Sequence, residues 1–316
     1  MSSKQVYRIR NWCHYNRALV NRGSLSVWLD EEVIQQWYSF NTAKRRGRPR
    51  TYSDLTIQAA LIIKSVFHLP LRATQGLLES LLGFMGLNLD CPDYSTICRR
   101  QKDLSFHLTD KNQGHDTSCE CVVVDSTGLK VFGEGEWKVR QYGYTKRRTW
   151  RKLHLAVDSN SHSIEAAAVS TNDFKDSELL PELLGQIEGS IERLCADGAY
   201  DSHEIYEVIE ARGTKPIIPP RKGAVIAQHG NCSAPEKPRD KVVRDIKKTG
   251  RKKWKIKTGY HKRSLAETTM YRIKTIFGGV LRSRLFETQA VEALLKCHIL
   301  NRMTSLGMPD SYVVKG

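Results

Sequence analysis

The middle of the chain carries the apolar patterns of strands. Residues 121–132, CVVVDSTGLKVF, contain two apolar runs that predict one bent strand or a strand and its continuation. Residues 149–158, TWRKLHLAVD, alternate, which sets Lys152 and His154 on one face. Residues 161–170, SHSIEAAAVS, predict a third strand, and the short connection before it predicts a hairpin.

Helices and strands then alternate along the chain. After the three strands the patterns predict a helix, a strand, a helix that ends at Gly213, another strand and a long helix over 258–277, and LFETQAVEALLKCHILNRM then predicts a last helix that closes the core. This order is typical of an α/β protein with an RNase H-like fold, in which a mixed five-stranded sheet has helices on both faces. The patterns follow one another as SELLPELLGQI, ERLCADGAY, SHEIYEVIEARG, TKPIIPP and TGYHKRSLAETTMYRIKTIF.

The last of these stretches, residues 258–277, is amphipathic. At about 100° per residue, Tyr260, Arg263, Glu267 and Lys274 share one arc of under about a quarter turn, and the apolar residues lie opposite. Taken alone, such a polar face also fits a solvated surface with an Arg263–Glu267 pair at i, i+4.

Residues 52–108 have a helical pattern. Ser53 is a candidate N-cap, Pro70 breaks the first helix, and a third short helix carries Arg99 and Arg100. Three short helices with a basic last one predict a helix-turn-helix-like DNA-binding domain. The alternative is a helical packing domain with a solvated basic face.

Two further stretches are strongly basic. Residues 44–50, KRRGRPR, within an N-terminal segment 1–51, resemble an AT-hook, which would insert Arg46 and Arg48 into a narrow minor groove. The alternative is an ordinary basic linker.

Residues 221–258 interrupt the predicted fold. Between 237 and 257, eleven lysines and arginines face two aspartates, which is too one-sided for a salt-bridged helix. We expect an insertion that contacts DNA, through Lys252 and Lys253 among others, and that is mobile without DNA. A solvated charged loop is the alternative.

The composition supports a polyanionic partner. The 316 residues have a net charge of +16, a pI near 9.5 and 40% hydrophobic residues, enough for a core. The N-terminus has no signal peptide pattern, and no apolar run approaches the roughly 20 residues that span a bilayer. We therefore expect a cytoplasmic, nucleoid-associated protein without a membrane partner. The eight cysteines fit free thiols, with a structural zinc site as the alternative.

Three acids stand at matching places in this layout. Asp125 follows the apolar run CVVV, and Asp197 follows the run LCA. The first and fourth strands of an RNase H-like fold are neighbours, so these acids should meet, with Glu267 supplied by the late helix. Carboxylate oxygens suit Mg²⁺ or Mn²⁺.

These residues resemble a known family. The spacing Y-x2-R-x3-E-x6-K, which starts at Tyr260, is similar to the signature helix of bacterial insertion-sequence DDE transposases of the insertion-sequence-4 and insertion-sequence-5 groups. Asp125 in VVVDSTGLKVFGEGEWK and Asp197 in ADGAYDS resemble the other two acids of that family. GEGEW, RKLHLAVD and the N-terminal layout resemble the insertion-sequence-5 side, and the resemblance covers nearly the whole chain.

The resemblance implies a mechanism. Asp125, Asp197 and Glu267 would be catalytic and would hold two Mg²⁺ ions, replaceable by Mn²⁺, with Asp125 bridging both. Water would cut at the element's end, and the freed 3′-hydroxyl would then attack target DNA. Strand transfer needs no ATP, in agreement with the lack of a GxxxxGK[ST] phosphate loop in the sequence.

The resemblance also implies DNA contacts and partners. Arg263 and Lys274 would hold phosphates beside the scissile bond, and Tyr260 would position the DNA. Trp137 is a candidate for stacking on a displaced base or for core packing, and Lys152 is a candidate that faces the site. The partner would be double-stranded DNA, namely terminal inverted repeats and target. Synapsis of two ends favours a homodimer or a higher oligomer on DNA.

Two other functions fit some of the same residues. An RNase H-fold nuclease that only hydrolyses would share the acids, and a DNA-binding regulator or a domesticated transposase would not need them. Our expected layout is an N-terminal segment at 1–51, a helical DNA-binding domain at 52–108 and a catalytic domain at 121–316, with the insertion at 221–258.

Overall fold

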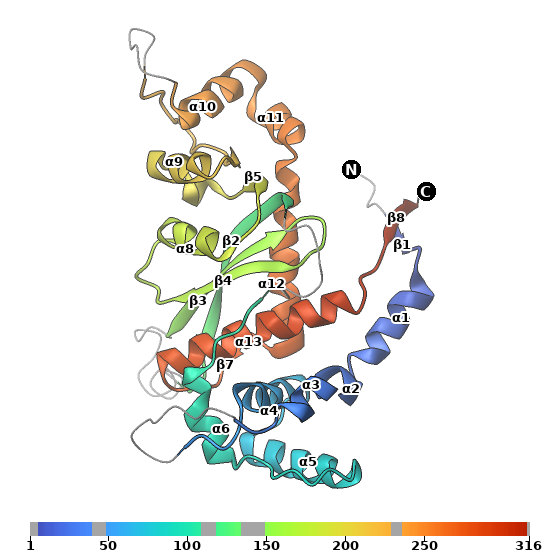
Figure 1. The fold of residues 1–316 in the computed structure, drawn as a ribbon. Coiled ribbons are helices and arrows are strands. Elements are labelled where there is room, and N and C mark those ends of the chain that lie inside the picture. The colour runs from blue at the N-terminus through green and yellow to red at the C-terminus, as the bar shows by residue number, and fades with distance from the viewer. Residues whose placement is uncertain (1–5, 40–48, 109–117, 134–148, 229–235, 315–316) are drawn as a thin grey trace, which may run out of the picture. The chain divides into compact units, whose positions relative to one another are not determined.

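The chain forms two compact units. The computed structural model describes residues 6–39, 49–108, 118–133, 149–228 and 236–314. The first unit comprises residues 1–106 together with 298–316, and the second comprises 107–297 (Figure 1). The last 19 residues, which the sequence analysis assigned to the catalytic domain, thus cluster with the N-terminal unit.

Helices make up most of the first unit. The three helices expected between 52 and 108 are present, and they contact one another in pairs. Ser53 caps the first of them, since its Oγ accepts a hydrogen bond from the Thr56 amide at 3.1 Å, and Pro70 directly precedes the second. The helices are α1 (Trp12–Asn21), α2 (Leu25–Trp28), α3 (Glu31–Gln35), α4 (Asp54–Val66), α5 (Leu71–Phe84), α6 (Tyr94–Arg100) and the 3₁₀ turn η1 (Gln101–Asp103).

A small sheet joins residues from the two ends of the chain. Strand β1 (Val6–Ile9) pairs antiparallel with β8 (Ser311–Val314). Each strand has four residues, too few for a period-two pattern to stand out in the sequence.

In the described chain, no single helix is long and apolar enough to cross a bilayer; α4 and α5 meet that criterion only jointly and are bent by 111° at their break.

A mixed sheet forms the centre of the second unit. Its order is β4-β3-β2-β5-β6, with β2 antiparallel to β3, β3 antiparallel to β4, and β5 and β6 parallel additions. This is the strand order that the sequence predicts. The strands are β2 (Cys119–Val131), β3 (Trp150–Asp158), β4 (Ile164–Ser170), β5 (Ile191–Cys195), β6 (Lys215–Ile217) and β7 (Val280–Leu281).

The long central strand β2 runs without a break through Asp125. On one side it pairs with β3 from Val122 to Lys130. On the other side it pairs with β5 as far as Val123, and then with β7 from Lys130. The sequence did not predict the two-residue β7, so the sheet has six strands instead of five. Within the described residues, β2 has no ladder partner on this side between Val123 and Lys130, and this interval is its open edge.

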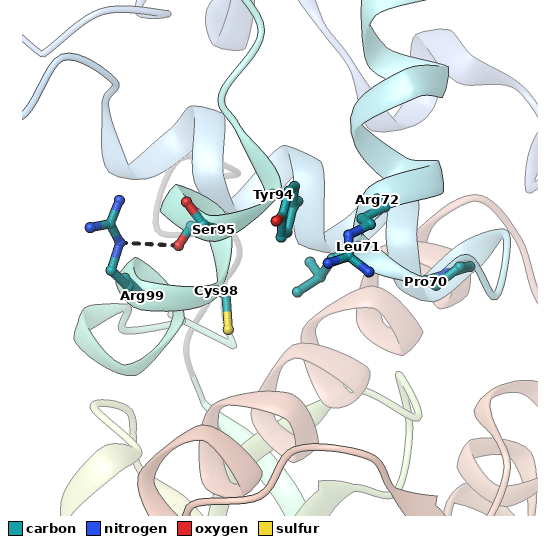
Figure 2. Close-up of a pocket in the computed structure, with 7 residues that line it drawn as sticks. All are labelled: Pro70, Leu71, Arg72, Tyr94, Ser95, Cys98 and Arg99. Atoms are coloured by element: carbon teal, nitrogen blue, oxygen red, sulfur yellow. Dashed lines mark hydrogen bonds between the residues drawn. The ribbon is translucent and has the colours of Figure 1, made fainter.

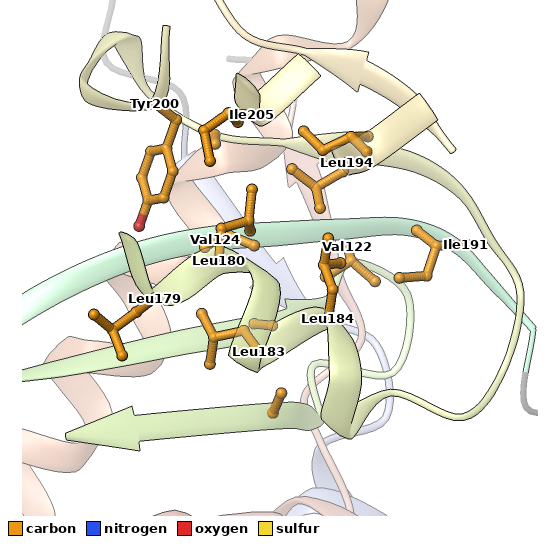
Figure 3. Close-up of a cluster of buried hydrophobic side chains, with 14 of the residues drawn as sticks. Val122, Val124, Leu179, Leu180, Leu183, Leu184, Ile191, Leu194, Tyr200 and Ile205 are labelled. Atoms are coloured by element: carbon orange, nitrogen blue, oxygen red, sulfur yellow. The ribbon is translucent and has the colours of Figure 1, made fainter. Parts of the chain in front are cut away.

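Apolar layers cover both faces of this sheet. On one face, Val122 and Val124 pack with Leu180, Leu183 and other buried side chains of the helices α8 and α9 (Figure 3). On the other face, Cys121 and Val123 pack with Ala266 and Trp254. The helices and turns of this unit are η3 (Asp176–Leu179), α8 (Leu180–Gln186), η4 (Gly198–Tyr200), α9 (His203–Ala211), α10 (Pro238–Thr249), α11 (Arg251–Thr258), η5 (Tyr260–Arg263), α12 (Ser264–Phe277) and α13 (Phe286–Ser305), the last of which continues into the first unit.

The basic insertion corrects one expectation. The one-sided charge argued against a helix here, but the insertion contains the helices α10 and α11. Val243 and Trp254 are buried, and the buried Asp240 accepts the amides of Ala227 and Gln228 at 3.1 and 2.8 Å. Burial of these apolar side chains, together with the hydrogen bonds of Asp240, therefore outweighs the like-charge repulsion that argued against helices here.

The late helix is also shorter than predicted. Residues Tyr260–Arg263 form the 3₁₀ turn η5, which follows Gly259 at φ +71°, and the α-helix α12 begins only at Ser264. Arg263 and Glu267 still lie one turn apart, and because side chains at i and i+3 of a 3₁₀ turn eclipse each other, Tyr260 stays on the side of Arg263.

Candidate active site

Asp125 lies at the point where β2 loses its parallel neighbour. Its Oδ1 accepts the Ser126 amide at 2.9 Å, and its Oδ2 accepts Nη2 of Arg263 at 2.9 Å. Burial raises the pKa of this carboxyl, and the charge of Asp197 raises it further, whereas the Ser126 amide and Arg263 lower it. Both carboxylate oxygens of Asp125 thus accept hydrogen bonds, and the negative charge of Asp197 contributes to its raised pKa.

Asp197 comes two residues after the end of β5. Because β5 is the parallel neighbour of β2, its carboxyl end delivers this acid to the region of Asp125. Its Oδ1 accepts the Ala199 amide at 2.8 Å and so caps the short turn η4. Asp125 and Asp197 act together in raising the pKa of both Tyr200 and Tyr260, after the larger effect of burial on each phenol.

Arg263 lies next to the predicted acids. Its Nη1 lies 3.1 Å from Oε1 of Glu267, while its Nη2 holds Asp125. Burial alone would lower the pKa of this guanidinium, but the charges of Asp125, Glu267 and Asp197 raise it above its usual value. The sequence predicted Arg263 as a phosphate ligand; in this structure it is the counter-ion of the predicted triad.

Tyr260 and Lys274 lie beside this group. The ring of Tyr260 is half-buried against Trp254, with centroids 6.4 Å apart, and Nζ of Lys255 lies 4.8 Å from its centre. Nζ of Lys274 donates to Oγ1 of Thr127 at 2.6 Å. Thr127 is two residues after Asp125, on the same face of β2, so Lys274 extends the polar surface along the strand from the acids.

Lys152 and His154 face the opposite side of the sheet. Nζ of Lys152 lies 3.0 Å from Oδ1 of Asp176 and 2.9 Å from the Phe174 carbonyl oxygen. The Lys152 ammonium group therefore forms an ion pair with Asp176. The buried His154 has Nε2 2.8 Å from Oγ of Ser170, and burial lowers its pKa. A structural hydrogen bond is the role the sequence favoured for His154.

In the first unit, adjacent arginines behave differently. Arg99 is exposed beside a pocket between the start of α5 and α6, and its Nε donates to the Ser95 carbonyl oxygen at 3.2 Å (Figure 2). Arg100 is buried and donates to Asp54 and to the Tyr52 carbonyl oxygen. The expectation that Arg100 faces DNA is therefore wrong, since its guanidinium ties α6 to α4.

The structure describes only some of the other predicted DNA contacts. Lys252 and Lys253 are exposed on α11. Arg46, Arg48 and Trp137 lie outside the described residues.

The structure adds four side chains that the sequence did not single out. Thr127 could have been found from the period of two that starts at Asp125. Ser126, Asp176 and Tyr200 lie on or near the reverse face of β2, and no local pattern marks them. Oγ of Ser126 donates to Oδ2 of Asp176 at 2.9 Å, and Tyr200 is buried.

The donor chemistry of the site fits a hard divalent cation. Three carboxylates around a positively charged guanidinium form a cation-attracting group of oxygen ligands, as Mg²⁺ and Mn²⁺ prefer. Within the described ranges, however, no three His, Cys, Asp or Glu side chains are grouped closely enough to hold an ion as they stand. For Asp125, Asp197 and Glu267 to hold an ion together, their side chains would have to move closer, and Arg263 would have to release Asp125 and Glu267, with which it pairs.

Comparison with known proteins identifies the family. A family model described as a transposase DDE domain matches residues 118–302, and a second of the same description matches residues 20–134. A solved structure, the Drosophila P element transposase strand transfer complex, is 13% identical over 61% of this chain with a TM-score of 0.33. The match spans 47% of the length of that chain, and a likeness this weak does not place the fold. The family match covers more than half of the residues, together with the acids at the sheet edge, and the chain thus belongs to the DDE transposase family.

Proposed function

We propose that this protein is a bacterial insertion-sequence transposase of the insertion-sequence-5 group. It binds the terminal inverted repeats of its element, cleaves at the ends and joins the 3′-hydroxyls to target DNA. The observation that carries the proposal is that Arg263 pairs with both Asp125 and Glu267 where β2 loses its parallel neighbour β5, with Asp197 two residues after the end of β5. Membership of the DDE transposase family implies polynucleotidyl transferase activity.

The proposed catalytic residues are the three acids. Asp125, Asp197 and Glu267 would hold two Mg²⁺ ions, which Mn²⁺ can replace. When bound, such ions supply Lewis-acid stabilisation of charge on the attacking and leaving oxygens of the phosphodiester. The carboxylates fix where that stabilisation acts, and the buried setting of Asp125 keeps its orientation constant.

Arg263 has two positions in this proposal. Without DNA, it neutralises the acids, whose mutual repulsion would otherwise be strong. With metal and DNA present, its planar guanidinium turns to a phosphate beside the scissile bond, for which its forked donors are suited. Lys274, beside Thr127, reaches a neighbouring phosphate.

The remaining DNA contacts spread the positive charge along the duplex. Arg99 on α6 and Lys252 and Lys253 on α11 are exposed cations that would bind phosphates. Two element ends must be held together for transposition, so we propose a homodimer on DNA, in the cytoplasm and on the nucleoid.

A transposition assay with element ends taken from DNA flanking the gene tests this function. Wild type is compared with Asp125→Asn, Asp197→Asn and Glu267→Gln, each shown to fold and to bind the ends. We expect transposition by the wild-type protein and by none of the variants. Cleavage without joining would identify a nuclease. Wild type that binds the ends without cleaving them would identify a regulator.

A further inference from the structure

A second polar group lies behind the proposed catalytic strand. Side chains alternate along β2, so Asp125 shares a face with Cys121 and Val123, which pack toward α12. By the same alternation Ser126 points to the other face, the one on which Val122 and Val124 pack. The residue next to Asp125 is thus anchored from the opposite side of the sheet.

Asp176 is the anchor. Its Oδ2 accepts the hydroxyl of Ser126 at 2.9 Å, and its Oδ1 lies 3.0 Å from Nζ of Lys152. Lys152 comes from β3, where it pairs with Gly128 of β2, and it also donates to the Phe174 carbonyl oxygen at 2.9 Å. One carboxylate therefore connects β2, β3 and the segment that starts η3.

Tyr200 is buried in the apolar layer that packs on this face of β2. Its ring is buried among the residues of Figure 3, and its hydroxyl has no hydrogen-bond partner within the described chain. The turns η3 and η4, which carry Asp176 and Tyr200, contact each other. Burial raises the pKa of Tyr200, and Asp176, Asp125 and Asp197 raise it further, so its hydroxyl lies within the field of all three acids.

The strand needs such an anchor at this place. Beyond Val123, β2 has lost β5 as a neighbour, and β7 does not begin to pair until Lys130. In that interval β3 alone holds the backbone by ladder bonds. The bond from Ser126 to Asp176 adds a tie within the interval, one residue from Asp125.

We propose that Asp176 is a positioning residue, which acts through Ser126 and Lys152 to hold Asp125 in the geometry required for binding a divalent cation. The inference rests on the proposed function of Asp125. Partners that orient a metal ligand typically change metal affinity about 10- to 100-fold when they are removed. Because Asp176 acts through the neighbouring residue, we expect the lower end, about 10-fold.

The experiment measures binding of Mn²⁺ alone to the full-length protein by electron paramagnetic resonance, with thermal unfolding in parallel. The variants are Asp176→Ala, Asp176→Asn and Ser126→Ala. The matched control is Asp173→Asn, an exposed acid of the same segment whose carboxylate accepts from Thr171. Asp125→Asn serves as the reference for loss of the site.

The expected result is a dissociation constant for Mn²⁺ about 10-fold higher in Asp176→Ala and Ser126→Ala, with Asp173→Asn unchanged. Asp176→Asn should lose less affinity, because its amide oxygen can still accept from Ser126. If Asp176→Ala does not fold, Ser126→Ala decides, since it removes one hydroxyl only.

Two results would overturn the inference. Folded Ser126→Ala and Asp176→Ala that bind Mn²⁺ like wild type would leave Asp176 a stabilising ion pair and nothing more. Loss in Asp176→Asn with none in Ser126→Ala would mean that its charge acts directly, without positioning. If Asp125→Asn itself binds Mn²⁺ like wild type, the proposed metal site is wrong, which is a separate failure.

Discussion

Arg263 places one guanidinium nitrogen 2.9 Å from the carboxylate of Asp125, so a predicted DNA ligand closes the predicted metal site. Its other terminal nitrogen holds Glu267 at 3.1 Å. A cation and an arginine cannot both occupy the space between these carboxylates. Metal binding and the release of Arg263 should therefore be coupled.

Arg263→Gln tests this coupling. Removing a positive charge from among three carboxylates should tighten binding of Mn²⁺ to the DNA-free protein by about 10-fold, since one repulsive charge is lost. Cleavage of element ends should nevertheless fall, because the phosphate contact is also lost. Mn²⁺ titration and a cleavage assay measure the two effects, with Arg284→Gln, an exposed arginine, as the control. Weaker Mn²⁺ binding by the variant would contradict the competition.

The adjacent arginines of α6 should separate stability from DNA binding. Arg100→Ala should lower the free energy of unfolding by about 2 kcal/mol, because it removes a buried guanidinium and its charged hydrogen bonds to Asp54 and to the Tyr52 carbonyl oxygen. Arg99→Ala should change stability by less than about 0.5 kcal/mol and should weaken binding to end DNA. Urea unfolding and fluorescence anisotropy measure the two. Equal destabilisation by both variants would contradict the structure.

Exposed lysines of α11 should act through phosphate charge. Lys252→Ala and Lys253→Ala should each reduce the slope of log K against log salt concentration by about 0.9, as expected for one phosphate contact. Lys255, whose ammonium lies over the ring of Tyr260, provides the matched control, and Lys255→Ala should change the slope less. Anisotropy titrations between low and moderate salt give these slopes. Unchanged slopes for both exposed lysines would remove α11 from the DNA interface.

Glu165 gives the second unit a pH-dependent stability. Burial, with a contribution from Asp158, raises the pKa of Glu165 from 4.5 to about 7. Its stabilising contribution is complete below pH 4.5 and is lost as pH rises through 7. Glu165→Gln should therefore be more stable than wild type at pH 8, by about 1–2 kcal/mol after allowance for partial exposure.

The comparison of unfolding at two pH values tests this prediction. The difference between Glu165→Gln and wild type should shrink to near zero by pH 4, where the wild-type side chain is neutral in both states. Glu182→Gln, at an exposed position on α8, is the control and should show no such dependence. A gain that is the same at both pH values would show that the effect is not ionisation.

The sequence predicted the sheet because its strands are marked by buried residues. The runs that end in Asp125 and Asp197 are apolar, β-branched or both, and the topology brings their ends together. The acids were therefore accessible to sequence reasoning. The two-residue β7 was not, because no pattern is readable over two positions.

Counting charges along the sequence gave wrong predictions where the burial of side chains determines the structure. Arg100 lies three residues after the buried Ile97, on the same face of α6, so one of two adjacent arginines faces inward. In the basic insertion, Val243 and Trp254 outweigh the surrounding lysines. Asp176 could not be found because its partners come from strands distant in sequence.

The open edge of β2 has a dynamic consequence. A central strand is ordinarily the slowest part of a sheet to exchange its amide hydrogens, since ladders protect it from both sides. Here protection should be high up to Val123 and again from Lys130, with faster exchange between, where β3 alone provides ladder bonds. The central strand would thus have its weakest ladder beside Asp125, at the point where the hydrogen bond from Ser126 to Asp176 supplies a side-chain tie in place of a neighbouring strand.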